Sequence, residues 1–231
     1  MLTKSGQSAE RRNLWVTTLM LVGLLASLIW LSGTAEPVTL PAAAAPAETA
    51  PTAAQIEELY RQLDDLQRQS DDLGRRIRED IDALHLRQQM MERARAAGTD
   101  PSLVDYAWDQ AAGYGVNPLV YVKQIDHESG WDAKALNVNR DLSVDRNLPQ
   151  INSATWPWLA AALHLTDPWD PKQAIQAGAY YMAVLLRENG GSYDRALTAY
   201  NRGEAGLQTW LASRGTARSP YSQAIMAGTE G

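Results

Sequence analysis

The pattern of apolar and polar positions divides the chain into four parts, and the first is an uncharged apolar segment. Residues 14–31, LWVTTLMLVGLLASLIWL, contain no Asp, Glu, Lys or Arg. A helix of this length rises about 27 Å, which is close to the hydrocarbon thickness of a bilayer. We therefore expect a single transmembrane helix over residues 14–32.

The charges around this segment predict its orientation. Lys4, Arg11 and Arg12 precede it, and the next basic residue is Arg61. The positive-inside rule then places residues 1–13 in the cytoplasm and the remainder in the periplasm, as in a protein of the bacterial inner membrane. The alternative is a secreted protein, because small residues before and at Ala35 suit cleavage of a signal peptide.

The second and third parts are predicted to be a tether and a helix. Residues 33–53 hold eight Ala and four Pro and no aromatic residue, which predicts an extended Pro/Ala-rich linker. Over residues 54–97, side chains at alternating spacings of three and four follow the a and d positions of a heptad. These positions hold Ile56, Leu59, Leu63, Leu66, Ser70, Leu73, Ile77, Leu84 and Met91. Asp80 and Arg87 interrupt the d series.

This heptad pattern leaves two interpretations open. We expect a short coiled coil, through which the chain associates with a second copy or with a partner helix. The alternative is a single amphipathic helix that packs on the C-terminal domain.

The fourth part, residues 98–231, predicts a compact all-α domain. Asp100, Asn117 and Asp170 each precede a proline, which is typical of an N-cap followed by the first helical residue. No stretch alternates apolar and polar residues for long enough to predict a strand. The polar residues 137–149 are predicted to form the longest loop, and long ordered loops are often functional.

Composition narrows the possible chemistry. The chain has no cysteine and a net charge of −6, which excludes disulfides, thiolate metal sites and cysteine nucleophiles. An acidic chain without a basic arm also argues against nucleic acid as a partner. His85, His127 and His164 are isolated and lack the spacing of metal ligands, so we expect neither a metal nor a cofactor.

Glu128 is the candidate catalytic group. On the helix that opens at Asn117, it shares a face with Tyr121 and Ile125 and lies in the last turn. Desolvation and the negative end of the helix dipole both raise the pKa of a carboxyl there. A carboxyl still protonated near neutral pH suits a general acid for glycoside cleavage. The alternative is an exposed carboxylate at a helix end.

A second catalytic carboxylate is not evident. Asp126 points away from Glu128 on a helix, whereas Asp132, Asp141 and Asp145 lie in or near polar loop sequence, where solvation is the expected role. One-acid chemistry is therefore favoured, with a group of the substrate serving as nucleophile.

Four motifs then carry a family resemblance. They are HESGWDAKA at residues 127–135, NLPQIN at 147–152, QAGAYY at 176–181 and ALTAYNRG at 196–203. In this order, over roughly residues 101–213, they resemble the soluble lytic transglycosylase catalytic domain, which is related to goose-type lysozyme. The resemblance implies a lysozyme-like helical fold. It also implies cleavage of the β-1,4 bond between N-acetylmuramic acid and N-acetylglucosamine, with 1,6-anhydromuramic ends as product.

The resemblance also implies roles for individual residues. Glu128 matches the catalytic acid, and Ser129, Gln150, Tyr181, Tyr200 and Asn201 match substrate-binding positions. Where the family has Gly-Leu-Met-Gln, this chain has Asn-Leu-Pro-Gln at 147–150, so we expect a reshaped cleft floor near Gln150.

Three functions are consistent with these residues. The first is a membrane-anchored lytic transglycosylase that remodels peptidoglycan glycan strands locally. The alternatives are a lysozyme-type hydrolase of the same bond and a weakly active glycan-binding scaffold of an envelope-spanning assembly.

Overall fold

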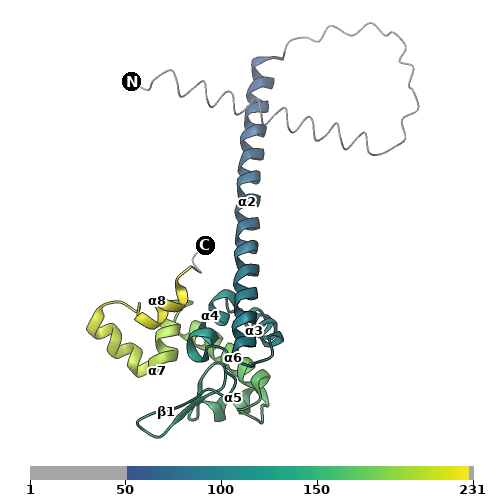
Figure 1. Cartoon of the computed structure of the whole chain (residues 1–231). Helices are drawn as coiled ribbons and strands as arrows, with labels where there is room; N and C mark the ends of the chain where they lie inside the picture. The colour runs from purple at the N-terminus through teal and green to yellow at the C-terminus, as the bar shows by residue number, and fades with distance from the viewer. Residues whose placement is uncertain (1–50, 229–231) are drawn as a thin grey trace, which may run out of the picture. The chain divides into compact units, whose positions relative to one another are not determined.

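The computed structural model describes residues 51–228 (Figure 1). The predicted transmembrane helix at 14–32 and most of the predicted linker lie outside the described residues. Between residues 51 and 228, no helix combines the length and the apolar character that crossing a membrane requires. The chain divides into two units, Met1–Leu59 and Tyr60–Gly231, and the cleft described below belongs to the second.

A single helix, α2 (Ala53–Ala96), occupies the stretch for which the heptad pattern predicts a helix. From Ile56 to Leu84 its apolar heptad side chains are exposed, with Leu63 at 58%, Leu66 at 62% and Leu73 at 59%. Its charged side chains pair within the helix, as Arg75 does with Asp72 at 2.5 Å and Glu79 at 2.8 Å. Nothing in the described chain covers these exposed side chains, and pairing with another helix stays a prediction.

The last turns of α2 pack on the domain that follows. Met90 and Ala94 are buried in its core. Arg87, which interrupts the heptad, donates from Nε to Asp105 Oδ1 at 2.5 Å on α3 (Ser102–Gly113). The second interpretation of the heptad pattern therefore holds for the end of the helix, and the core reaches ahead of residue 98, where the sequence placed the boundary.

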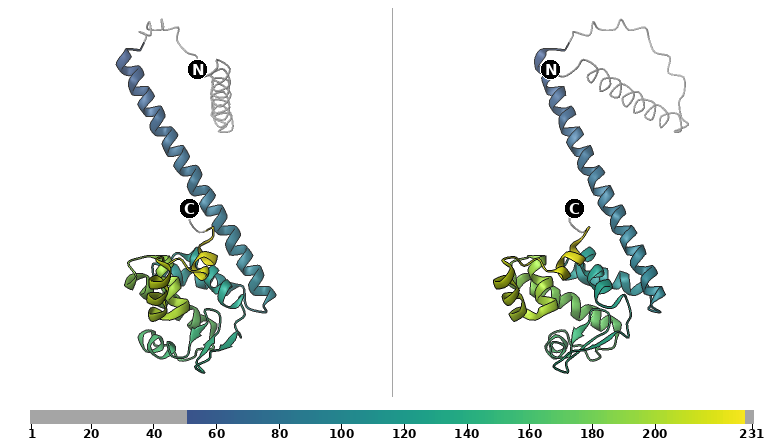
Figure 2. Two further views of the ribbon diagram at one scale, coloured as in Figure 1. Left: turned by 90° about the vertical axis from the view of Figure 1, so that its left-hand side faces the viewer. Right: turned by 60° about the vertical axis from the view of Figure 1, so that its left-hand side comes forward.

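The domain is mainly helical, as predicted. After α3 come α4 (Pro118–Ser129), α5 (Trp156–Leu163), α6 (Pro171–Glu188), α7 (Tyr193–Arg214) and α8 (Pro220–Met226). Asp170 caps α6 as expected, since its side chain accepts from Lys172 N at 2.8 Å. The helix α6 is the central one, because it packs against α3, α5 and α7 and buries most of its apolar residues (Figure 2).

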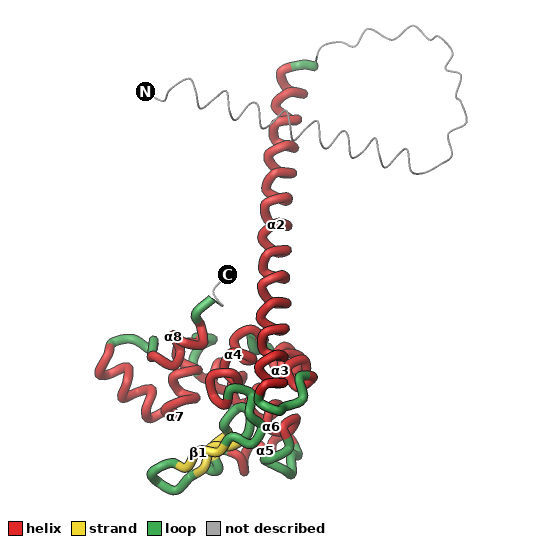
Figure 3. Tube along the Cα trace, in the orientation of Figure 1, coloured by secondary structure: helices red, strands yellow, loops and turns green. Residues whose placement is uncertain are grey.

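The mainly helical domain also contains one small antiparallel sheet. The strands β1 (Leu136–Val138), β2 (Val144–Arg146) and β3 (Ile151–Asn152) lie in that order (yellow in Figure 3). The prediction of a loop over 137–149 was wrong, because strands of two or three residues are too short to show a hydrophobic alternation. Polar side chains hold this sheet instead.

Candidate active site

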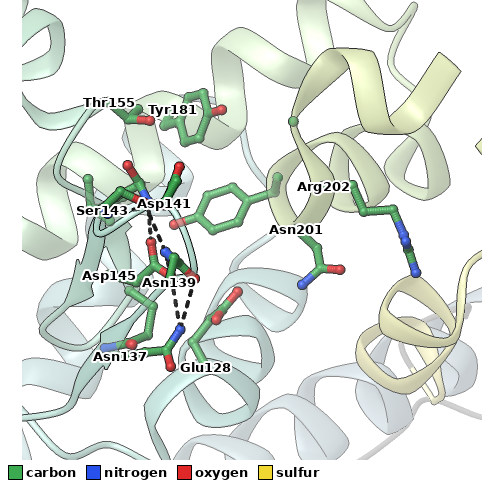
Figure 4. Close-up of a pocket in the computed structure, with 15 residues that line it drawn as sticks. Glu128, Asn137, Asn139, Asp141, Ser143, Asp145, Thr155, Tyr181, Asn201 and Arg202 are labelled. Atoms are coloured by element: carbon green, nitrogen blue, oxygen red, sulfur yellow. Dashed lines mark hydrogen bonds between the residues drawn. The ribbon is translucent and has the colours of Figure 1, made fainter. Parts of the chain in front are cut away.

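A cleft of about 550 Å³ opens between the sheet and the helices α4, α6 and α7 (Figure 4). Glu128 comes from α4, Tyr181 from α6, and Tyr200, Asn201 and Arg202 from α7. The opposite side is lined by side chains of the three strands and their turns: Asn137, Asn139, Asp141, Ser143, Asp145, Gln150, Ile151, Asn152 and Thr155. Nearly all of these groups are polar, as a surface that binds sugar hydroxyls requires.

Local sequence places Glu128 at the cleft. Asn117 caps α4 by accepting from Leu119 N at 2.9 Å. Tyr121 and Ile125 are fully buried, so Glu128, on the same face, is drawn against the domain and is partly buried. The alternative of a fully exposed helix-end carboxylate does not hold.

Two left-handed residues end α4 directly after this position. Gly130 has φ 58° and Trp131 has φ 67°. The left-handed conformation costs a bulky residue about 1–2 kcal/mol. The indole of Trp131 is completely buried and donates to Met90 Sδ at 3.4 Å, which offsets that cost. The sharp turn thereby fixes the end of the helix that carries Glu128.

Burial raises the pKa of Glu128 from an ordinary 4.5 to about 7, which confirms the predicted direction. Two neighbours adjust this pKa. Tyr221 Oη, from α8, donates to Glu128 Oε1 and lowers the pKa, whereas the negative charge of Asp145 raises it. Glu128 therefore has both a protonated and an ionised form available near neutral pH.

Asp145 is the centre of a polar cluster that the sequence did not predict. Its Oδ1 accepts from Asn152 Nδ2 at 2.7 Å, and its Oδ2 accepts from Asn139 at 2.9 Å and Asn137 at 3.3 Å. The strand register explains this, because Asp145 lies directly opposite both Asn137 and Asn152. We call these four residues the amide cluster, and three of them, Asn137, Asn139 and Asp145, face Glu128 in the cleft (Figure 4). The expectation that Asp145 is simply solvated was wrong.

The predicted substrate-binding residues are brought together with one exception. Gln150, Tyr181, Tyr200 and Asn201 line the cleft with Glu128. Ser129 is not among the lining residues; its Oγ donates back to Ile125 O at 3.1 Å, within its own helix.

The cleft floor keeps the backbone that a glycine would favour. Asn147 replaces the family glycine and has φ 63°, a left-handed conformation that asparagine tolerates better than most residues. Its Oδ1 accepts from Leu148 N at 2.7 Å, and Gln150 Nε2 donates to Asn147 O at 2.7 Å. The backbone at residue 147 is thus one that glycine also adopts, and the expected reshaping near Gln150 stays a prediction.

The cleft floor packs closely on α6, where Pro149 lies against Gly178. A Cβ on Gly178 would lie 2.5 Å from Tyr121 Oη and 2.8 Å from Pro149 Cβ, so only glycine fits there. Tyr200 Oη donates to Pro149 O at 2.8 Å. The tyrosine of the AYN motif thus supports the loop that carries Gln150.

Tyr221 and the amide cluster are the functional candidates that sequence reasoning missed. Asn137 and Asn139, two residues apart, were a weak signal for one face of a strand. Tyr221 follows Glu128 by 93 residues, and no local pattern links them. Within residues 51–228, no group of three His, Cys, Asp or Glu side chains is arranged to hold a metal ion.

A mainly helical domain with one protonatable glutamic acid in a polar cleft defines the lysozyme-like class of protein. The family model named transglycosylase SLT domain matches residues 105–221, which is half of the chain. The chain therefore belongs to the transglycosylase SLT domain family, and membership implies a transglycosylase that acts on peptidoglycan. No solved structure matches the chain.

Proposed function

We propose that this protein is a lytic transglycosylase that cleaves the β-1,4 bond between N-acetylmuramic acid and N-acetylglucosamine and leaves 1,6-anhydromuramic ends. The observation that carries the proposal is the position of Glu128. Its carboxyl lines a polar cleft, and burial keeps its pKa at about 7. A group with this pKa can both donate and take back a proton near neutral pH.

The proposed reaction needs one acid and no water. Glu128 gives its proton to the bridging oxygen as the bond from that oxygen to C1 of the muramic residue breaks. The Glu128 carboxylate then takes the proton from the C6 hydroxyl of the same sugar, whose oxygen bonds to C1. The acid is regenerated and the charges balance. Because Tyr221 donates to Oε1, Oε2 is left as the oxygen that exchanges the proton.

Hydrolysis of the same bond is the second candidate, and Asp145 is the observation that favours it. A second carboxylate across the cleft can activate water, as in inverting glycosidases. However, both of its oxygens already accept hydrogen bonds from asparagine amides. This reduces its capacity to act as a base and favours the anhydro product.

One experiment separates these functions. The purified chain is incubated with peptidoglycan, and the released fragments are analysed by mass spectrometry. Anhydro ends support the proposal, reducing ends select the hydrolase, and binding without cleavage selects the glycan-binding scaffold. Glu128→Gln should lose at least a hundredfold in rate, whereas the matched control Glu188→Gln, an exposed carboxyl at the end of α6, should retain activity. An equally active Glu128→Gln would exclude it as the acid.

We also propose that residues 14–32 anchor the protein in the inner membrane with the cleft in the periplasm, where peptidoglycan lies. The uncharged segment and the basic residues before it support this placement. Protease added to intact spheroplasts should remove the C-terminal domain, and N-terminal sequencing of the mature protein distinguishes an anchor from a signal peptide cleaved near Ala35.

We propose further that α2 pairs with a second copy of itself. Up to Leu73, the residues that flank the exposed apolar side chains of the heptad are uncharged, among them Gln62, Gln67 and Gln69, so two copies would not repel each other along this part of the seam. Such a pair would present two cleavage sites to neighbouring glycan strands.

A further inference from the structure

Arg202 lines the cleft and has no role in the reaction proposed above. It follows Asn201 at the point where α7 breaks: Gly203 has φ 70° and ψ 166°, outside the helical range. In Figure 4, Asn201 lies between Glu128 and Arg202, which places the arginine towards one end of the cleft.

The structure holds the Arg202 side chain in place. Its guanidinium carbon lies 4.6 Å from the centroid of the Trp210 ring. Gly206 provides the room, because a Cβ there would lie only 2.7 Å from Arg202 Cβ. A guanidinium held over an aromatic ring does not use its N–H groups for that contact, and their planar fork matches the two oxygens of a carboxylate.

The charges of the cleft indicate what this edge could bind. Glu128, Asp141 and Asp145 line the same cleft, and Arg202 is the only Lys or Arg among the described residues that line it. In the described part of the chain, no carboxylate lies within salt-bridge distance of Arg202. An anionic ligand would therefore be repelled by one side of the cleft and attracted to this one position.

We propose that Arg202 binds a carboxylate carried by the side group of the muramic residue, and so sets the direction in which the glycan strand lies across Glu128. This inference rests on the proposed function, because peptidoglycan supplies the ligand. The carboxylate has two possible sources, the lactyl acid of a bare strand or the stem peptide attached to it.

The test measures binding with the full chain carrying Glu128→Gln, so that cleavage does not interfere. Its ligands are a muropeptide with its stem peptide, the same disaccharide after an amidase has removed the peptide, and both after coupling of every carboxyl to methylamine. Arg202→Gln should weaken binding of an unmodified ligand about tenfold and leave the neutral ligands unchanged. Arg202→Lys should retain only part of the affinity, because an ammonium lacks the planar fork.

Arg214→Gln is the matched control, since Arg214 contacts the same Trp210 ring at 5.2 Å but does not line the cleft. It should bind all four ligands as the parent does. A loss confined to the peptide-bearing ligand assigns the peptide carboxylate, and a loss confined to the stripped ligand assigns the lactyl acid. Equal losses on charged and neutral ligands, no loss on any, or the same loss in Arg214→Gln would overturn the proposal. Failure of the proposed function would show separately, as the absence of anhydro products from the unsubstituted chain.

Discussion

The raised pKa of Glu128 implies that the active site costs the protein stability, and Glu128→Gln measures that cost. An acid whose pKa is higher in the folded state than in the unfolded state binds its proton more tightly when folded. Below pH 4.5 the carboxyl is protonated in both states, and it contributes no pH dependence. Between pH 4.5 and about 7 it ionises first in the unfolded state, so the free energy of unfolding falls as pH rises.

The size of this stability penalty is set by the difference between the pKa of Glu128 in the unfolded state, 4.5, and its pKa in the folded state, about 7. It corresponds to a penalty of up to about 3 kcal/mol at pH 8. Glutamine has the same shape and cannot ionise, and its amide oxygen can still accept from Tyr221. Glu128→Gln should therefore match the unsubstituted chain at pH 4 and be more stable at pH 8 by up to about 3 kcal/mol.

Urea denaturation of both proteins at pH 4, 6 and 8 measures the difference directly. The same series with Glu188→Gln, whose carboxyl is exposed, controls for the general effect of removing a negative charge. A stability difference between Glu128→Gln and the unsubstituted chain that is the same at all three pH values would refute the reasoning, because the fold would then show no preference for the protonated acid.

The remaining predictions concern the neighbours of the acid and the long helix. Asp145→Asn removes a charge that raises the pKa of the acid, so the alkaline limb of the rate profile should move to lower pH. Tyr221→Phe removes the donor that lowers this pKa, so the limb should move to higher pH; shifts in the same direction would contradict both assignments. Gly178→Ala should lower the free energy of unfolding by about 1–3 kcal/mol in urea denaturation, because its methyl group has no space. Ser70→Cys, the sole cysteine in an otherwise cysteine-free chain, should form a disulfide-linked dimer on mild oxidation if α2 pairs in parallel and in register, whereas Asp71→Cys, off the seam, should stay monomeric on a non-reducing gel.

The features that the sequence predicted are local ones. The start of α4 at an Asn-Pro pair, the cap of α6 at Asp170 and the apolar face that carries Glu128 all depend on residues a few positions apart. Helix caps and helix periodicity act over the same short range, so a sequence pattern is enough to show them. The rise in the pKa of Glu128 followed from the same local face.

The features that the sequence did not predict depend on residues far apart in the chain. Tyr221 reaches Glu128 only because α8 packs against α4. The sheet escaped prediction because Asn, Asp and Ser are poor strand formers, and here their side chains bond to one another rather than to a hydrophobic core. In the sequence, Arg87 only interrupts the heptad pattern. Its role depends on Asp105, which belongs to another helix, α3.

Because of the amide cluster, alternate positions of one short hairpin should differ in how well they tolerate substitution. Leu136 and Val138 are 54% and 61% exposed, so substitutions there disturb little of the packing. Between them lies Asn137, one of three amides that depend on the single carboxylate of Asp145. If each residue of this hairpin is substituted at random and active variants are selected, neighbouring positions should differ sharply in the number of residues they accept. Position 145 should accept the fewest.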